Sequence, residues 1–162
     1  MSQTGPVTDE RAPLPPALAE IAEDFSSVSQ SDRLQLLLEF SDGLPPLPER
    51  LAGEPDKLER VDECQSPVYL VVELDDEVDG AAGDRTVHLH VQAPAEAPTT
   101  RGFAGILHEG LDGLSAAEVL AVPDDAPYRF GLAEAVSPLR LRGMVGMLGR
   151  IKRQVRLKAG LL

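Results

Sequence analysis

The chain has 162 residues, of which 43% are apolar but only 4% are aromatic, and its formal net charge is −12. This length fits one domain with a single core, which must be built from aliphatic side chains. The acidic balance excludes general nucleic-acid binding, because neutralising phosphates requires clustered lysine and arginine.

The first expected elements are a leader and a short helix. Residues 1–13 are polar and proline-containing, which is typical of a disordered segment, so a single domain is expected over residues 14–162. Apolar residues recur at helical spacing from Leu18 to Phe25, directly after two prolines. Because amides of a first helical turn have no helical partner, prolines there favour a helix start.

A second helix is predicted from Ser29 to Gly43. Ser29 can cap the helix and Asp32 lies at the capping-box spacing, while Gly43 precedes a proline-rich segment that ends it. The buried stripe expected on this helix consists of Leu34, Leu37, Leu38 and Ser41.

The hydrophobic pattern then changes from helical to alternating. Residues 68–74 and 85–93 are β-branched and alternating, and the acidic, glycine-containing residues 75–84 separate them. The pattern predicts two antiparallel strands joined by a flexible tip. Pro67 fits only at the start of its strand, where no ladder amide is required, so Cys64 is expected in a loop or tight turn just before the strand.

Helices are predicted again after the strands. Phe103, Ile106, Leu107 and Leu111 form one apolar helical face. A further helix, through about Leu120, opens with a capping box of Ser115 and Glu118. Ser137 and Pro138 are suited to begin a long last helix. Its apolar stripe is Leu141, Met144, Val145, Leu148, Ile151 and Val155. This order of elements indicates an α+β fold in which helices cover a small antiparallel sheet.

Charge is distributed unevenly along the chain. Residues 1–138 contain 8 basic and 27 acidic residues, whereas residues 139–162 contain 7 basic and no acidic residues. The last helix is therefore expected to be a basic, solvated element that complements the acidic body of its own domain.

Cys64 is the only cysteine, so the chain cannot form an internal disulfide and a reducing compartment is expected. The N-terminal residues lack the layout of a secretory signal, and no apolar run approaches the roughly 18 residues of a membrane span. These features predict a soluble, cytoplasmic protein without membrane association.

Metal and nucleotide sites are poorly supported. One cysteine with His88, His90 and His108 cannot hold an iron–sulfur cluster, which needs about three cysteines. His88 and His90 share a strand face and are interpreted as ordinary sheet surface. The glycine spacings match neither a P-loop nor a dinucleotide motif. The chain is therefore expected to bind no cofactor or metal of its own.

Three interpretations of Cys64 remain open. The residue can be a small buried apolar side chain, or a thiol that a partner reaches at the sheet edge. It can also be the nucleophile of a hydrolase with His88 or His108 as base, although no protease signature surrounds it. Asp62 and Glu63 disfavour the thiolate, so an activating cation or amide donors must come from elsewhere.

Three segments in the expected order carry a resemblance. Residues 63–69 read Glu-Cys-Gln-Ser-Pro-Val-Tyr, close to a Gly-Cys-x-Ser-x-Val-aromatic motif, with Glu63 in place of glycine and Tyr69 in place of the usual tryptophan. The second segment, EAPTTRGFAGIL, contains Glu96, Arg101 and Gly102. The third, VSPLRLRGMVGM, contains Ser137, Pro138, Arg140, Gly143 and Met147. Together they resemble the SufE family, the sulfur acceptors of the Suf iron–sulfur assembly system, over about residues 14–158.

The resemblance implies a SufE/IscU-like fold and a sulfur carrier. Cys64 is expected to take a persulfide sulfur from a SufS-type cysteine desulfurase, to stimulate that enzyme, and to deliver the sulfur to a SufB-containing scaffold. The PLP belongs to the desulfurase. One thiol is sufficient for a carrier, since a second could resolve the persulfide as a disulfide. The expected partner-binding residues are Gln65, Ser66, Glu96, Arg101 and Gly102.

Arg140 is expected to support the reaction at Cys64. If Ser137 is the N-cap, Arg140 is at the third helical position, where the helix dipole disfavours a cation and an anionic neighbour is expected. That neighbour is either a carboxylate of this chain or, as the resemblance implies, the cysteine loop or the partner's surface. The rival function is a non-carrying adaptor that regulates a partner enzyme by docking, with Cys64 only structural.

Overall fold

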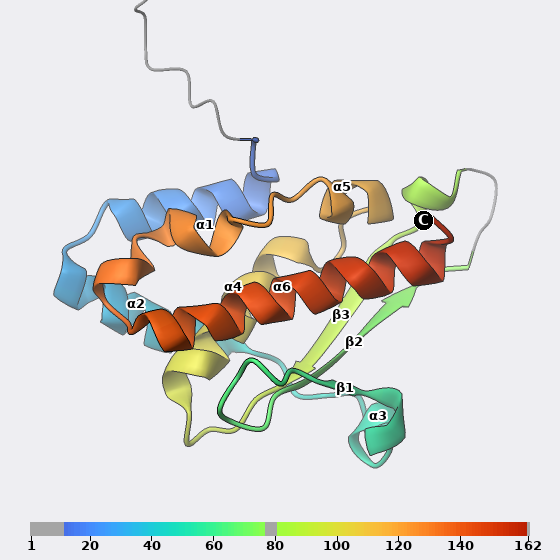
Figure 1. The fold of residues 1–162 in the computed structure, drawn as a ribbon, viewed down its shortest axis with the longest axis horizontal. Helices are drawn as coiled ribbons and strands as arrows, with labels where there is room; N and C mark the ends of the chain where they lie inside the picture. The colour runs from blue at the N-terminus through green and yellow to red at the C-terminus, as the bar shows by residue number, and fades with distance from the viewer. Residues whose placement is uncertain (1–11, 77–80, 162) are drawn as a thin grey trace, which may run out of the picture.

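The computed structural model describes residues 12–76 and 81–161. In these residues, helices and strands follow one another in an α+β arrangement, as the sequence predicts (Figure 1). The elements are α1 (Pro16–Ser26), α2 (Gln30–Gly43), α3 (Glu49–Ala52), β1 (Glu59–Arg60), β2 (Tyr69–Leu74), β3 (Val87–Gln92), α4 (Pro98–Leu111), α5 (Ala116–Leu120) and α6 (Pro138–Ala159). Short 3-10 turns are η1 (Pro55–Lys57), η2 (Ala82–Asp84), η3 (Ala126–Phe130) and η4 (Leu132–Glu134).

The sheet contains three antiparallel strands in the order β1-β2-β3. The predicted hairpin is confirmed, because β2 and β3 pair along their full lengths. β1 pairs Glu59 with Leu70 and Arg60 with Tyr69 at the other edge of β2. It is not evident in the sequence, because two residues are too few to show a strand periodicity.

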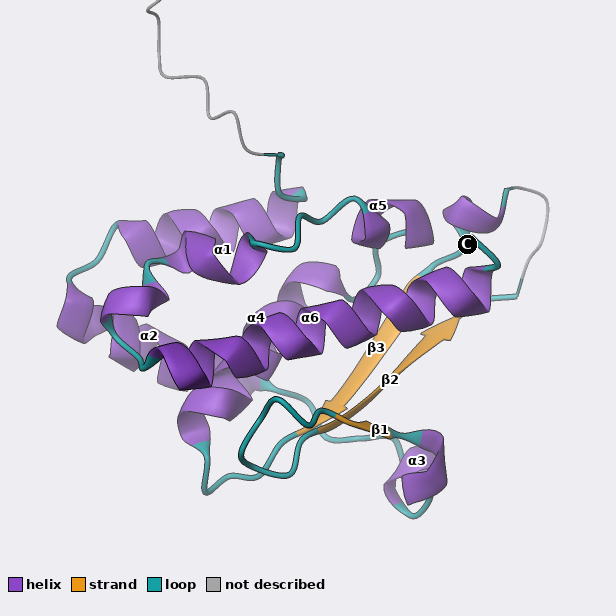
Figure 2. Ribbon diagram, viewed as in Figure 1, coloured by secondary structure: helices purple, strands orange, loops and turns teal. Residues whose placement is uncertain are grey.

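One face of the sheet is buried and the other is mostly polar, although Val71 on that second face is only 6% exposed. Leu70 and its partner Val91 are at most 3% exposed, whereas Glu73 and its partner His88 point to the opposite face. α6 packs on β2, and α4 packs on both β3 and α6. Figure 2 shows α6 crossing the strands and α3 beyond β1, apart from the other helices. The helices therefore cover one side of a small sheet.

Helices α2 and α4 pack closely because α4 presents glycines to α2. A Cβ atom on Gly102 would lie 2.6 Å from the carbonyl oxygen of Leu37, and one on Gly105 would lie 2.2 Å from that of Phe40. Backbone atoms cannot rotate away as a flexible side chain can. The distance between the two helices therefore depends on residues without a Cβ atom.

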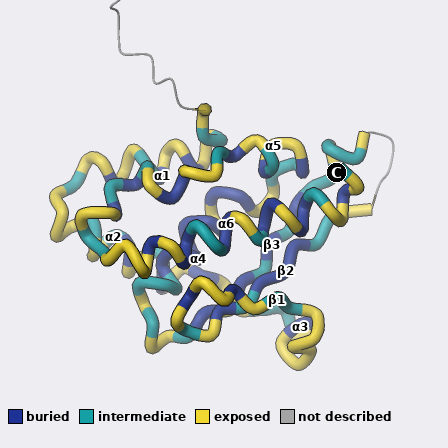
Figure 3. The backbone as a smooth tube through the Cα atoms, in the orientation of Figure 1, coloured by how far each residue is buried: buried dark blue, intermediate teal, exposed yellow. Residues whose placement is uncertain are grey.

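The core is aliphatic with a small aromatic cluster. Phe25 stacks on Phe40 with ring centroids 5.8 Å apart and meets the edge of Phe130 at 6.0 Å. Figure 3 shows buried segments along α4, α6, β2 and β3, while α3 is mostly exposed. This core holds α6 and the strands in fixed relative positions, which matters for the loop before β2.

The buried stripe predicted for α2 needs correction. In α2, Leu37 and Ser41 are buried as expected, but Leu34 is 41% exposed and Leu38 is 38% exposed. Because α4 is the main partner of α2, only a narrow stripe of α2 is covered. The apolar face predicted after the strands is confirmed in α4, which begins at Pro98 because a proline in the first turn requires no amide partner.

The predicted helix caps are present. Ser29 accepts a hydrogen bond from the Asp32 amide at the start of α2. Ser115 and Glu118 form both bonds of a capping box at α5. These local contacts satisfy amides that have no partner within their helices.

Parts of two predictions lie outside the described residues. The leader expected over residues 1–13 is described only at Ala12 and Pro13, and residues 77–80 of the expected tip are not described. None of the helices in the described ranges combines the length and the apolar composition that a bilayer crossing requires.

Replacing Gly105 with alanine is expected to lower the free energy of unfolding by about 1–3 kcal/mol, because the new methyl group overlaps the Phe40 carbonyl. Gly149 on α6 is the matched control, since its Cβ would meet nothing within 4 Å. Alanine there should raise the free energy of unfolding by about 0.5–1 kcal/mol through helix propensity. Urea unfolding followed by circular dichroism measures both. Equal effects would contradict the close contact between α2 and α4.

Candidate functional site around Cys64

The loop that carries Cys64 connects β1 to β2. Its ends are joined by a hydrogen bond from the Val61 amide to the Val68 carbonyl, 2.9 Å long, and the Cys64 amide donates to the Val61 carbonyl at 3.1 Å. Val61 and Val68 are fully buried. The loop is therefore anchored in the core at both ends, and the residues between these anchors lie against α6.

Two glycines of α6 make this contact possible. A Cβ atom on Gly143 would lie 2.9 Å from Cys64 Sγ, and one on Gly146 would lie 2.7 Å from the Glu63 side chain. Gly143 and Gly146 are three residues apart, so they lie on the same side of the helix. Cys64 and Glu63 thus pack on successive glycines, close to the start of α6.

The loop backbone needs no glycine before Cys64. No residue other than glycine has a positive φ angle in the described ranges. Glu63, which stands where the related motif has glycine, therefore adopts an ordinary backbone conformation. Its side chain is free to interact with α6.

The Cys64 thiol is nearly buried and is held in its protonated form. Only 5% of the residue is exposed, and Sγ donates to the carbonyl oxygen of Gly143 at 3.6 Å. Burial, followed by the nearby Glu63 carboxylate, raises the pKa of Cys64 to about 11, while Arg150 acts weakly in the opposite direction. The prediction that Asp62 and Glu63 disfavour the thiolate is confirmed for Glu63 only, because Asp62 is 76% exposed and lies 3.7 Å from the Arg150 guanidinium. Of the interpretations left open by the sequence, the structure shows the buried thiol, and the accessible thiol at the sheet edge is not seen in this state.

A small pocket of about 150 Å³ adjoins the thiol. Its lining comes from the Cys64 loop, from the segment that leads into α4 and from the start of α6. These residues are Glu63, Cys64, Gln65, Ser66, Glu96, Ala97, Pro98, Thr100, Leu139, Arg140 and Gly143. The pocket can hold only a few atoms, whereas sites for drug-sized ligands occupy roughly 300–1,000 Å³.

Five of the predicted site residues meet at this pocket and two do not. Cys64, Gln65, Ser66, Glu96 and Arg140 all line it. Arg101 instead donates to the carbonyl oxygens of Ser41 at 2.9 Å, Ala93 at 2.7 Å and Leu44 at 3.2 Å. Gly102 is buried against Leu37. Arg101 therefore joins α4 to the end of α2 and to the segment after β3, and Gly102 allows α4 to pack closely on α2.

Arg140 is exposed and lines the pocket at the start of α6. Ser137 caps α6 by accepting from the Arg140 amide at 3.2 Å, which places Arg140 at the third helical position as predicted. Its guanidinium forms no ion pair with any carboxylate among the residues that the structure describes. The compensating anion expected for this cation is therefore not found within this part of the chain.

None of the three histidines lines the Cys64 pocket. Nε2 of His88 lies 2.7 Å from Asp75, and Nε2 of His90 lies 2.9 Å from Glu73, both on the outer sheet face. His108 lines a separate pocket between α2 and α4. A cysteine–histidine pair is thus lacking, which argues against the hydrolase interpretation. Across the described ranges, no group of three potential metal-binding side chains comes together.

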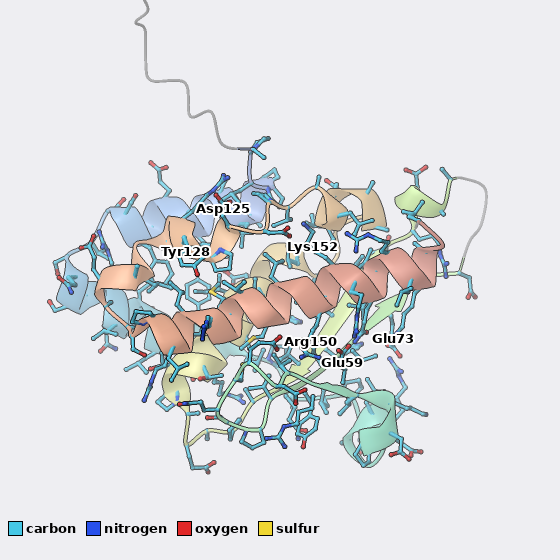
Figure 4. All side chains as sticks on the ribbon, viewed as in Figure 1. Glu59, Glu73, Asp125, Tyr128, Arg150 and Lys152 are labelled. Atoms are coloured by element: carbon cyan, nitrogen blue, oxygen red, sulfur yellow. The ribbon has the colours of Figure 1, made fainter. Side chains whose placement is uncertain are left out.

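The sequence analysis did not identify the ion pairs between α6 and the carboxylates of β1 and the Cys64 loop. Arg150 on α6 donates to Glu63 at 2.9 Å and to Glu59 at 2.7 Å. Figure 4 shows Arg150 and Glu59 on the same side of α6, while Lys152 leaves the helix on the other side. These contacts confirm that the basic helix pairs with the acidic body, but the expectation that its charges are solvated is wrong for Lys152, which is 8% exposed. The glycines spaced three apart along α6 were the available signal for the loop contact.

Comparisons with known proteins converge on one family. Residues 19–155 match the sequence model of SufE, described as an Fe-S metabolism associated domain. An uncharacterised SufE-like protein of Mycobacterium tuberculosis is 53% identical over 145 residues, which cover 90% of this chain and 95% of that protein. SufE-like protein 1, chloroplastic/mitochondrial, of Arabidopsis thaliana is 29% identical over 136 residues, covering 83% of this chain and 33% of that protein.

A solved structure extends the likeness to the fold. The solution structure of a hypothetical protein from Thermus thermophilus superposes with a TM-score of 0.73 at 41% sequence identity. The match covers 93% of this chain and all of that chain. The arrangement of helices around a small sheet is therefore shared by both proteins.

The raised thiol pKa predicts a pH dependence of stability. Because the pKa of Cys64 is about 11 in the folded protein and near 9.0 ordinarily, the folded state binds more protons between these values. The contribution is fully present below pH 9.0 and is lost as the pH rises through about 11. Relative to Cys64→Ala, the wild type should lose about 2 kcal/mol over this interval. Urea unfolding at several pH values measures this loss, and parallel curves for the two proteins would contradict it.

Proposed function

This chain belongs to the SufE family, and from that membership and the setting of Cys64 we propose that it is a sulfur carrier of iron–sulfur metabolism. Cys64 accepts sulfur from the persulfide of a SufS-type, PLP-dependent cysteine desulfurase, and the protein stimulates that enzyme. It then delivers the sulfur to a SufB-containing scaffold. The observation that carries the proposal is that the only thiol of the chain adjoins a few-atom pocket built from three segments.

The proposed transfer is a thiol exchange without net oxidation. The Cys64 thiolate attacks the terminal sulfur of the donor persulfide, the donor S–S bond breaks, and the donor cysteine leaves as a thiolate. One S–S bond is broken and one is formed, so no oxidant or reductant is consumed. The chain has one cysteine, so no neighbouring thiol of its own can resolve the new persulfide as an internal disulfide.

The loop must move before this reaction occurs. A thiol that is 5% exposed, with a pKa of about 11, is neither accessible nor ionised at neutral pH. Docking of the desulfurase is proposed to draw the loop out and ionise the thiol. After transfer, the loop returns and the terminal sulfur occupies the small pocket, away from water and reductants.

The rim of the pocket supports docking next to the thiol. Leu139 is 47% exposed and Arg140 is exposed beside it, at the start of α6. An apolar side chain next to a cation that has no ion-pair partner among the described residues suits a partner surface with a carboxylate. Glu96, Gln65 and Ser66 complete the proposed contact from the other two segments.

The direct test is intact-mass analysis after incubation with a SufS-type cysteine desulfurase, cysteine and PLP. Wild-type protein is expected to gain the mass of one sulfur atom, and Cys64→Ser is expected to gain none, because the acceptor is lost. Absence of added sulfur on the wild type contradicts the carrier.

The same incubation distinguishes the adaptor. Desulfurase turnover is measured with wild-type protein whose Cys64 is alkylated. A carrier with a blocked thiol no longer increases turnover in the presence of an acceptor, whereas an adaptor that acts only by docking continues to stimulate the enzyme.

Arg140→Ala is expected to slow sulfur transfer by about fivefold, the effect of one exposed ion pair, without changing the unfolding midpoint. Arg142→Ala is the matched control, because Arg142 is also exposed on α6 but lies outside the pocket lining. Residues two apart on a helix point in different directions. Stopped mass analysis gives both transfer rates. Equal slowing would assign the effect to net charge rather than to the position of Arg140.

A further inference from the structure

Between its anchors, the Cys64 loop packs on two glycines of α6 and makes two side-chain hydrogen bonds to that helix among the described residues. Cys64 Sγ bonds the Gly143 carbonyl, and the Glu63 carboxylate accepts a 2.9 Å hydrogen bond from Nε of Arg150. Asp62 lies 3.7 Å from the same guanidinium and is far more exposed, at 76% of its side chain. Glu63 is therefore the main charged link between the cysteine loop and the last helix.

Arg150 is placed to join the loop to the sheet. Its Nη1 donates to Glu59 of β1 at 2.7 Å, and its side chain is only 21% exposed. Glu59 also pairs with Arg153 and accepts from Gln154 at 2.8 Å, so β1 keeps partners on α6 without Arg150. Glu63 has no ion-pair partner besides Arg150 in the portion of the chain described here.

From these contacts we infer that the Glu63–Arg150 ion pair is a latch that keeps the Cys64 loop closed on α6. Glu63 and Arg150 are positioning residues, since they act on the reacting sulfur through the backbone of the loop. The latch explains how the loop stays closed before a partner docks, and in this respect it rests on the proposed function. The latch itself is a property of the free protein, so it can be tested without any partner.

The Glu63–Arg150 ion pair is weak enough for the Cys64 loop to open. The hydrogen bond from Arg150 lowers the pKa of the Glu63 carboxyl, so the pair stays charged at neutral pH. Glu63 is 43% exposed, and solvent therefore screens the interaction. Such a pair biases the loop toward the closed state by a small factor, and a competing carboxylate on a partner can replace Glu63 at Arg150.

Arg150 influences Cys64 in two opposite ways, which makes the latch distinguishable from a simple charge effect. As a nearby cation it lowers the pKa of the thiol, so its removal alone should make Cys64 less reactive. As part of a latch it keeps the loop closed, so its removal should make Cys64 more accessible. The sign of the change in reactivity therefore decides between them.

The experiment measures the rate at which iodoacetamide alkylates Cys64 in the free, full-length protein at neutral pH and low salt. Arg150→Gln is expected to react about two- to fivefold faster than the wild type. Arg153→Gln is the matched control, because Arg153 is on the same helix and pairs with Glu59 but does not contact Glu63. It should react at the wild-type rate. An unchanged or slower rate for Arg150→Gln, or an equal increase for Arg153→Gln, overturns the latch.

A second comparison covers the case in which Arg150→Gln is globally destabilised. Glu63→Gln is introduced into the wild type and into Arg150→Gln. If the two residues form a latch, Glu63→Gln accelerates alkylation less when Arg150 is already absent. If Glu63 acts only through the thiol pKa, the acceleration is the same in both backgrounds and the latch is rejected.

The salt dependence of alkylation gives a third readout, in which the ion pair of the wild-type protein is weakened without a substitution. Added sodium chloride should accelerate alkylation of the wild type and have little effect on the double variant Glu63→Gln/Arg150→Gln. An equal response of both proteins overturns the latch. Sulfur loading by the desulfurase is measured separately by intact mass, so a failed latch leaves the carrier proposal standing, and a failed carrier leaves the latch standing.

Discussion

The close approach of the Cys64 loop to α6 is the constraint on which the site depends. It exists because Gly143 and Gly146 have no side chains, so that Cys64 and Glu63 occupy the space over the helix. Burial of the thiol, its hydrogen bond to a helix carbonyl and its raised pKa all follow from this contact. The same contact brings the start of α6 to the edge of the pocket.

The rest of the fold serves to hold that contact in place. The sheet fixes the two ends of the loop through Val61 and Val68, while the core side of α6 packs on β2. Glycines of α4 allow a comparably close contact with α2, and Arg101 ties three carbonyl groups to the start of α4. Because these elements are packed and hydrogen-bonded, the opening proposed for the site can be confined to the loop.

Membership of the SufE family and the local chemistry explain each other. The proposed carrier would have to shield a reactive persulfide and also release it, and a buried cysteine on a loop held to α6 by two side-chain hydrogen bonds meets both needs. Glu63 differs from the glycine of the related motif, yet its backbone is unstrained and its carboxylate binds Arg150. The departure from the motif therefore adds a charged contact to this site rather than disrupting the loop.

The α+β class, the β2–β3 hairpin, the helix caps and the choice of Cys64 as the candidate thiol could be predicted from the amino-acid sequence, because periodicity, capping residues and motifs are local signals. The exposure of Leu34 and Leu38, the packing of Arg101 and Gly102 within the scaffold, and the contact of Arg150 with Glu63 became evident only in the folded protein. Those outcomes depend on which elements pack together across long stretches of chain. A single sequence carries no local pattern from which such distances can be read.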